Sequence, residues 1–327
     1  MLVMIYITGD THNTEDMSNV SANNMKLCCA EQNVDYSKIT NLIILGDFGL
    51  PWYDCPVDES GIHPTNKTDK YLLKWYNKKP FKILCVMGNH DNYDMIKRLP
   101  EVSMFGSSVL KVSENIYYLM RGEVYNIEGH SFLVLGGAKS DDKEFRKPHK
   151  NWWPDEELNE EEKENCLLHI NSYYKKKFDY ILSHTGPSKG IACADSYYLN
   201  EENCKQLKSD STVCFNDEID KMISYKKWFF GHWHSDWGYE NFMNTKYVPL
   251  YRMGIVIHER KSKIYLLNSV GKENEYMIIL REMEDGYIVK ITRNIDGKEN
   301  VHTDYISKTL FNSCIQTGFL KKSNKQF

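Results

Sequence analysis

The chain has 327 residues, of which 41% are hydrophobic and 26% are charged, and its formal net charge is -4. This composition is typical of a globular protein with a large core, and it argues against a disordered chain or a surface that neutralises long runs of phosphate. The nine cysteines are scattered and form no CxxC pair. They argue against a disulfide framework or a thiolate zinc site and favour a reducing compartment.

The N-terminal stretch MLVMIYITGD predicts a first buried strand rather than a targeting segment. No basic region precedes its apolar run, which stops at Asp10 and is too short for a signal peptide. No run in the chain approaches the roughly 18 apolar residues that a membrane span needs. We therefore expect a cytoplasmic protein with no membrane association.

Short apolar runs that stop abruptly at Gly or Ser predict five buried strands. Continuous apolar runs of this length suit strands that are covered on both faces. Helical spacing appears between them, most clearly over 155–177, where Pro154 precedes an expected cap at Asp155. The strands are expected at 2–8, 41–45, 81–87, 178–182 and 226–230, and two further helices at 17–32 and 66–79.

After residue 234 the pattern changes to β. Residues 251–271 predict a hairpin, and 276–306 predict three strands joined at Asp285-Gly286 and Asp296-Gly297. A short helix from Ser307 to Thr317 follows. We expect a catalytic domain over 1–271, a β-hairpin appendage with a short helix over 272–320 and a flexible tail over 321–327. Covering the site, dimerisation and stabilisation all stay open as roles for the appendage, and so does the oligomeric state.

Each of the five predicted strands is followed by side chains that can bind metal. One aspartate after a strand is usually a turn residue or a cap, and a single HxH at a strand end usually lies on the surface. Five such clusters in order are harder to explain in this way, because sites in open α/β sheets form beyond the carboxyl ends of strands. The clusters are Asp10 with His12, Asp47, Asn89 with His90 and Asp91, His184, and His232 with His234.

The side chains offer carboxylate, imidazole and amide groups but no thiolate. This donor set suits manganese, iron, zinc, nickel or cobalt better than calcium or a structural zinc. Two metals about 3.5 to 4 Å apart can clamp a phosphoryl group, and the pair needs roughly seven or eight protein ligands. Seven are present, namely Asp10, His12, Asp47, Asn89, His184, His232 and His234.

The motif order D-x-H, G-D, G-N-H-D, H and G-H-x-H, from residue 9 to 234, resembles the calcineurin-like metallophosphoesterase superfamily. The stretches GGAKSDDKEFR and WWPDEE are similar to uncharacterised bacterial and phage-type members, a comparison that names no substrate. The resemblance implies an α/β fold, a four-layer α/β/β/α metallophosphoesterase sandwich, here with a small C-terminal β-rich appendage. It also implies two divalent transition metal ions, with manganese favoured and iron, zinc, nickel or cobalt as alternatives.

By the same resemblance, one metal would be held by Asp10, His12, Asp47 and His234, and the other by Asp47, Asn89, His184 and His232. The reaction would be attack on phosphorus by a metal-bridging hydroxide. His90 would donate a proton to the leaving oxygen, and Asp91 would orient it. If residues 232–234 are extended, His232 and His234 point the same way and address adjacent metals, while Trp233 points into the packing.

The expected substrate is a small, nucleotide-like phosphoester. After Asp47 the chain reads FGLPWYD, without the DRG of the phosphoprotein phosphatases in this superfamily. Phosphodiesterases, nucleotide phosphatases and nucleases remain. The acidic balance argues against a nuclease, and the complete ligand set argues against a non-catalytic binding module. Expected substrate contacts are Asn89, His90, Arg146 and Trp52, although packing is the alternative for the tryptophan.

Overall fold

A computed structural model describes residues 4–200, 204–205, 207–236, 245–258, 264–267, 275–283, 285–295 and 298–322. The chain divides into two compact units. The first comprises Met1–Ile127 and Ser131–His258, and the second comprises Glu128–His130 and Glu259–Phe327. The domain bounds expected at residues 271 and 320 stay predictions.

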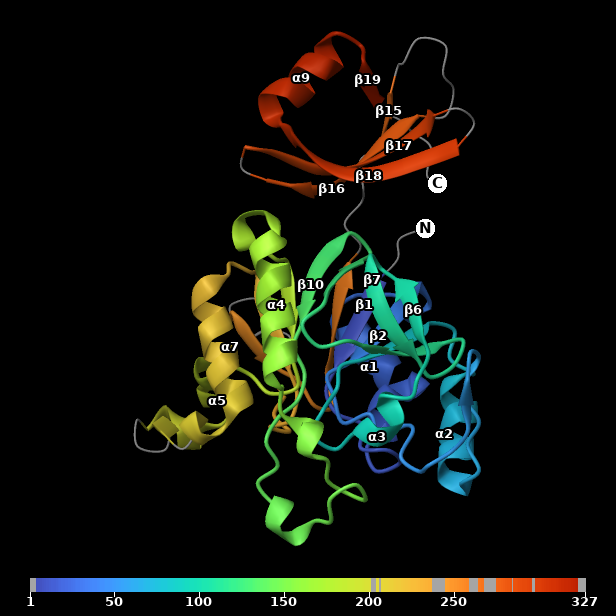
Figure 1. Ribbon diagram of the computed structural model, residues 1–327, viewed down its shortest axis with the longest axis vertical. Helices are drawn as coiled ribbons and strands as arrows, with labels where there is room; N and C mark the ends of the chain where they lie inside the picture. Colours follow the sequence, from blue (N-terminus) through green and yellow to red (C-terminus); the bar gives the residue numbers. More distant parts are fainter. Residues whose placement is uncertain are drawn as a thin grey trace. The chain divides into compact units, whose positions relative to one another are not determined.

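Two sheets form the centre of the first unit (Figure 1). The pairs β1–β2, β2–β5 and β5–β8 are parallel, and so are β10–β11, β11–β12 and β12–β13. The seven-stranded sheet runs β14 (Gly254–His258), β1 (Met4–Thr8), β2 (Ile39–Ile44), β5 (Lys82–Cys85), β8 (Ile116–Leu119), β7 (Ser107–Lys111) and β6 (Glu101–Met104). The five-stranded sheet runs β13 (Tyr247–Pro249), β12 (Lys227–Phe230), β11 (Tyr180–Leu182), β10 (His130–Val134) and β9 (Val124–Ile127). A small hairpin joins β3 (Val57–Asp58) to β4 (Gly61–Ile62).

Helices cover the outer face of each sheet (Figure 1). The seven-stranded sheet carries α1 (Ala22–Glu31), α2 (Lys67–Tyr76) and α3 (Tyr93–Ile96). The five-stranded sheet carries α4 (Glu160–Ser172), α5 (Ser188–Ala194) and α7 (Ser211–Met222). Short 3₁₀ segments are η1 (Met17–Val20), η2 (Tyr36–Lys38), η3 (Lys143–Phe145), η4 (Pro154–Glu156), η5 (Tyr174–Lys176), η6 (Ser196–Leu199) and η7 (Leu207–Ser209).

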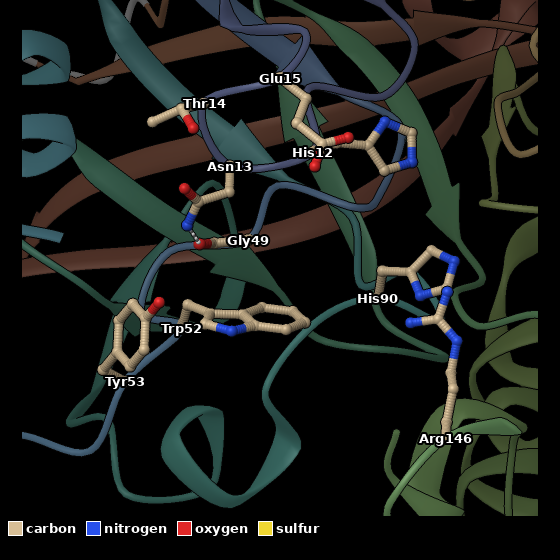
Figure 2. Close-up of a pocket in the computed structure, with 9 residues that line it drawn as sticks. All are labelled: His12, Asn13, Thr14, Glu15, Gly49, Trp52, Tyr53, His90 and Arg146. Carbon is tan, nitrogen blue, oxygen red and sulfur yellow. Dashed lines mark hydrogen bonds between the residues drawn. The ribbon is translucent and has the colours of Figure 1, made fainter. Parts of the chain in front are cut away.

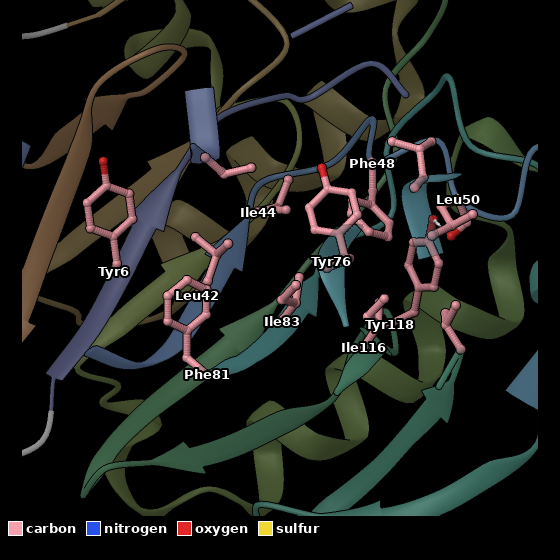
Figure 3. Packing of buried hydrophobic residues seen from close by; sticks show 14 of the residues in the cluster. Tyr6, Leu42, Ile44, Phe48, Leu50, Tyr76, Phe81, Ile83, Ile116 and Tyr118 are labelled. Atoms are coloured by element: carbon pink, nitrogen blue, oxygen red, sulfur yellow. Dashed lines mark hydrogen bonds between the residues drawn. The ribbon is translucent and has the colours of Figure 1, made fainter. Parts of the chain in front are cut away.

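Alternate residues of the central strands pack into different cores. On β1, Ile5 and Ile7 lie in the core between the two sheets. Tyr6, from the same strand, packs with Leu42 and Tyr76 beneath the helices (Figure 3). Because both faces are buried, the strands read as continuous apolar runs. The four-layer α/β/β/α prediction is confirmed, and so are the five predicted strands and the helices α1 and α2.

Two predicted elements are wrong, the helix in its extent and the hairpin in its strand pairing. The helix expected over 155–177 begins at Glu160, where the side chains and backbone of Asn159 and Glu162 form a capping box. The hairpin expected over 251–271 does not form between its two strands. Instead β14 pairs antiparallel with β1, and β15 (Ile264–Leu267) pairs with β16 (Tyr276–Glu282) and β19 (Leu320–Lys322).

The second unit contains an antiparallel sheet in the order β18-β17-β16-β15-β19. β17 spans Gly286–Ile295, β18 spans Lys298–Ser307, and α9 spans Lys308–Gln316. Phe311 of α9 packs with Tyr265 and Met277 in a separate core. The predicted β-rich C-terminal region and its short helix are confirmed, while Asp296-Gly297 lies outside the described residues. In the described part of the chain, we find no helix with the length and apolar character required to span a membrane.

Candidate metal centre

The structure brings together the side chains that follow β1, β2, β5, β11 and β12. One group consists of Asp10, His12 and His234, whose potential ligand atoms all lie within 4.8 Å of one another. Nε2 of His234 is 3.2 Å from Oδ2 of Asp10, and the His12 and His234 ring centroids are 4.9 Å apart. His234 also stacks on Tyr251, with ring centroids 4.3 Å apart, so a residue from the segment after β13 supports this side of the site.

A second group, Asp10, Asp47 and His184, is fully buried and meets the same 4.8 Å limit. Nδ1 of His184 lies 2.7 Å from the Leu45 carbonyl oxygen, which can only accept a hydrogen bond. The ring therefore carries a proton on Nδ1 and directs Nε2 at the site. Nε2 is 3.3 Å from Oδ1 of Asp47 and 2.8 Å from Oδ1 of Asn89.

His232 and His234 reach the site by a different backbone route from the expected one. Their φ angles are 64° and 46°, so the segment is left-handed rather than extended, and the alternation of side chains expected for an extended segment does not apply to it. The His232 ring lies 5.0 Å from that of His184. His12 and Asp47 are also left-handed, with φ of 40° and 49°. Trp233 packs against the core as expected, and its Nε1 donates to Oγ1 of Thr185 at 3.1 Å.

Glycines before the clusters allow the ligand side chains to pack against backbone. A Cβ on Gly46, where φ is +104°, would lie 2.1 Å from Nδ1 of His184. A Cβ on Gly88 would lie 2.2 Å from Oδ1 of Asp47. No larger residue fits at either position without displacing a candidate ligand.

His90 and Asp91 act on different partners. The His90 backbone N–H donates to Oδ1 of Asp47 at 2.7 Å, while its ring lines the pocket described below. The Asp91 carboxylate accepts from the N–H groups of Gly49 and Gly88, both at 2.8 Å, and from the Tyr118 hydroxyl at 3.0 Å. The expectation that Asp91 orients the His90 ring is not met by these bonds. Asp91 instead holds two loops together beneath the site.

Sequence reasoning missed two residues near Asn89. Ser140 contacts Asn89 directly, and Glu156 is linked to it by a hydrogen bond from Ser140. Oγ of Ser140 accepts a hydrogen bond from Nδ2 of Asn89 at 2.9 Å. Ser140 in turn donates its hydroxyl and its backbone N–H to the buried carboxylate of Glu156. Both residues lie in the stretches GGAKSDDKEFR and WWPDEE, whose resemblance assigned neither of them a role, and the folded chain shows their contact with Asn89.

A pocket of about 360 Å³ opens beside the cluster, a size within the usual range of roughly 300–1,000 Å³ for small-molecule sites. His12 and His90 line its inner side. Figure 2 shows the Arg146 guanidinium extending toward the His90 ring, with Trp52 and Tyr53 on a separate part of the wall. Nε of Arg146 donates to Oδ1 of Asp142 at 2.6 Å. The pocket therefore combines a cation with aromatic surface.

The Trp52 wall of the pocket is held from behind by a buried carboxylate that sequence reasoning missed. Oδ2 of Asp69 accepts the backbone N–H groups of Trp52 and Tyr53 at 3.1 and 3.0 Å. Nδ2 of Asn92 donates to the Trp52 carbonyl at 2.7 Å. The indole also makes an edge-to-face contact with Trp153, which is itself buried and belongs to the packing. Trp52 is thus a fixed part of the wall.

The charges of the cluster favour a bound cation. Burial lowers the pKa of His184, but the Asp47 and Asp10 carboxylates outweigh it and raise the pKa to about 10. Burial also lowers the pKa of His12, and the hydrogen bond and charge of Asp47 raise it to about 9. Burial and the charge of His184 lower the pKa of His232 to about 3, which keeps that ring neutral.

Protons on His184 and His12 thus take the place that a cation would fill in balancing the acids. The chemistry of the donor set points the same way, because buried carboxylate, imidazole and amide atoms converge without a thiolate. The residues present therefore fit a divalent metal site. The assignment of each ligand to one of two metals stays a prediction.

Parallel strands that end in a buried cluster of acids and histidines, beside a pocket lined by an arginine and a glutamate, define a metal-binding α/β protein. The chain belongs to the calcineurin-like phosphoesterase family, whose model matches residues 3–236. A second family match, without a functional description, covers residues 256–326. The first match and the ligand cluster together support metal-dependent phosphoesterase chemistry in general and imply a binuclear divalent centre.

The individual relatives give little information about the substrate of this chain. An uncharacterized protein of Treponema pallidum (strain Nichols) is 39% identical over 56 residues, which is 17% of this chain, and the match spans 29% of that relative. Vacuolar Protein Sorting 29 from Cryptosporidium parvum aligns over 94% of this chain and 99% of its own, with 9% identity and a TM-score of 0.25. Phosphopantetheinyl hydrolase (PptH) from Mycobacterium tuberculosis aligns over 71% and 83%, with 12% identity and a TM-score of 0.32. At these scores neither structure bears on the substrate.

Proposed function

We propose that the protein is a metal-dependent phosphoester hydrolase, either a phosphodiesterase or a phosphatase, that acts on a small nucleotide-like molecule. The observation that carries the proposal is the convergence of Asp10, Asp47 and His184 in one buried cluster beside a pocket. The oxygen and nitrogen donor set favours manganese, with iron, zinc, nickel or cobalt as alternatives.

The candidate ligands divide as the family resemblance implies, with Asp10, His12, Asp47 and His234 around one ion and Asp47, Asn89, His184 and His232 around the other. When bound, the ions supply charge to the phosphoryl oxygens and lower the pKa of bound water. The chain itself holds this centre by donating the Nδ1 proton of His184 to Leu45 and the His90 backbone proton to Asp47.

His90 is the proposed proton donor to the leaving oxygen. Its Nε2 lies 3.2 Å from Nδ2 of Asn89, which can only donate. The neutral ring therefore carries its proton on Nδ1. Burial lowers the pKa of His90, so the ring is more often neutral and is a stronger acid when it does carry a second proton. Arg146, on the same side of the pocket, can bind a phosphoryl oxygen through its guanidinium.

We expect purified protein to hydrolyse bis(p-nitrophenyl) phosphate or p-nitrophenyl phosphate, to lose this activity after chelation and to regain it with Mn²⁺. The reason is that the acids and imidazoles of the cluster cannot by themselves balance the charge that develops on the phosphoryl oxygens. Release of p-nitrophenolate measures the rate. Protein that binds Mn²⁺ but hydrolyses neither compound would favour a non-catalytic binding module on this fold.

We expect Trp52→Ala to raise KM for p-nitrophenyl substrates by roughly tenfold with little change in kcat, because stacking on an aromatic side chain is lost. Initial rates over a range of substrate concentrations separate the two constants. Trp52→Phe keeps a ring and should lie near wild type, and Tyr71→Ala removes an aromatic residue that is 53% exposed and outside the pocket. An unchanged KM in Trp52→Ala would show that this tryptophan only packs.

Nuclease activity is the second candidate function of the same metal centre. The net charge of -4 gives no sign of a basic groove, and the described pocket contributes one arginine. Incubation with single-stranded and double-stranded polynucleotides, followed by a nucleotide library that includes cyclic dinucleotides, distinguishes the two readings.

A further inference from the structure

A buried carboxylate, a hydroxyl and an amide form a continuous series that ends at the metal centre. Glu156 and Ser140 are only 1% and 2% exposed. The backbone N–H of Ser140 lies 3.1 Å from Oε1 of Glu156, and its hydroxyl contacts Oε2. Nδ2 of Asn89 lies 2.9 Å from the same hydroxyl oxygen.

The direction of the protons along this series follows from elementary chemistry. Burial raises the pKa of Glu156, and the hydrogen bond from Ser140 opposes this shift. In its ionised form the carboxylate only accepts hydrogen bonds, so the hydroxyl proton of Ser140 points at Glu156. The Ser140 oxygen can then only accept, and its other neighbour, Asn89, has to present its NH₂ group. The amide oxygen of Asn89 is left to face Nε2 of His184, at 2.8 Å.

If the side-chain amide of Asn89 were reversed, a different atom would face the metal centre. It would place an NH₂ group, which has no free electron pair to offer a cation, where Oδ1 now stands beside His184 and Asp47. The two orientations of an asparagine have almost the same shape, so packing alone does not select one. The selection has to come from hydrogen-bond partners. The His90 ring also faces Nδ2 of Asn89, but an imidazole can change its tautomer, whereas Glu156 provides a fixed polarity.

Hydrogen bonds hold the backbone of Glu156 and of its neighbour Asp155. Its carbonyl accepts the N–H of Ala138 at 3.2 Å, and its own N–H donates to Trp153 at 3.1 Å. The buried Arg121 donates to the Asp155 carbonyl at 2.9 Å and to Oε1 of Glu162 at 2.7 Å. The carboxylate therefore acts from a rigid segment of the chain.

We propose that Glu156 is a positioning residue that acts through Ser140 to keep the amide oxygen of Asn89 turned toward the metal centre. The proposal rests on the proposed function only in taking Asn89 as a metal ligand, and it predicts metal affinity independently of turnover. This role of Glu156 gives the segment between β10 and α4 an indirect part in metal binding.

The test reverses the direction of hydrogen-bond donation along Glu156, Ser140 and Asn89 without changing the shape of the side chains. In Glu156→Gln, the new NH₂ group can donate to the Ser140 oxygen, so the hydroxyl turns to donate to Asn89 and the amide oxygen turns away. We expect Mn²⁺ affinity, measured by isothermal titration calorimetry on the full chain, to fall roughly 10- to 100-fold, as for other partners that orient metal ligands. Glu157→Gln is the matched control, because Glu157 accepts the N–H and the hydroxyl of Ser211 in the same way but contacts no candidate ligand.

A second background separates orientation from general damage. In Asn89→Asp either carboxylate oxygen can face the metal, so orientation no longer matters, and adding Glu156→Gln should not weaken Mn²⁺ binding further. Equal losses from Glu156→Gln in the wild-type chain and in the Asn89→Asp variant would show that Glu156 only supports the fold, and would overturn the proposal. Wild-type affinity in Glu156→Gln would overturn it as well. If the wild-type chain binds Mn²⁺ and shows this pattern without hydrolysing any phosphoester, the proposed function fails and this inference stands.

Discussion

Replacing Asp47 by Asn should abolish metal binding and turnover together. Asp47 is almost fully buried, and its Oδ2 lies 3.2 Å from Nε2 of His12 while its Oδ1 lies 3.3 Å from Nε2 of His184. It is the carboxylate expected to bind both ions. Burial opposes its charge, but the charge of His184 and the hydrogen bond from His12 hold the pKa of Asp47 well below its usual range. The surroundings of Asp47 therefore favour its ionised form.

The Asn variant is a clean test because it preserves the backbone. Asp47 has φ of 49°, and Asn tolerates left-handed conformations at least as well as Asp. We expect the loss of Mn²⁺ affinity to exceed the roughly 10- to 100-fold typical of an indirect partner. Calorimetry and p-nitrophenolate release measure the two effects, and Asp58→Asn serves as the control because the Asp58 side chain is 60% exposed. Normal Mn²⁺ stoichiometry in Asp47→Asn would remove Asp47 as the shared ligand.

His90→Asn should separate metal binding from catalysis. The contact between His90 and Asp47 runs through the backbone N–H, at 2.7 Å, and Asn keeps that group. Only the ring that lines the pocket is lost. Removal of a positioned proton donor commonly costs about 10²- to 10⁴-fold in rate, so we expect kcat to fall by this amount with Mn²⁺ affinity near wild type.

The control for this variant is His63→Asn. The His63 ring is 51% exposed and pairs with Asp58 away from the cluster, so its loss should change neither quantity. A substrate with a better leaving group than p-nitrophenol adds a second measure, because it needs less help from a proton donor. Loss of Mn²⁺ in His90→Asn equal to that in Asp47→Asn would contradict the division of roles between the two residues.

The layers of the first unit could be predicted because burial leaves a clear mark on the sequence. Strands covered on both faces, such as Met4–Thr8, need apolar residues at every position, and the polar residue that follows marks the strand end. The ends of neighbouring parallel strands meet at one edge of a sheet, so Asp10 and Asp47 could be expected to converge. His184 follows a strand of the other sheet, and its place beside them depends on how the two sheets pack.

Local patterns failed where a distant partner decides the structure. Nothing in residues 251–271 says that Gly254–His258 pairs with a strand near the N-terminus. The start of α4 could have been found, because Asn159 and Glu162 have the spacing of a capping box. Asp69 has the position of an ordinary acid in the first turn of α2, yet its carboxylate binds the backbone of another loop. Contacts of this kind follow from tertiary packing and leave no periodic signal.

The strands β13 and β14 have a consequence for how much of the chain can fold alone. The family match ends at residue 236, yet Gly254–His258 pairs with every residue of β1, and Tyr251 stacks on His234. A polypeptide truncated at residue 236 would expose β1 as an unprotected apolar sheet edge, the kind of edge that recruits other chains into aggregates. The stretch that the calcineurin-like phosphoesterase model matches is therefore shorter than the sheet to which it belongs, which includes Gly254–His258.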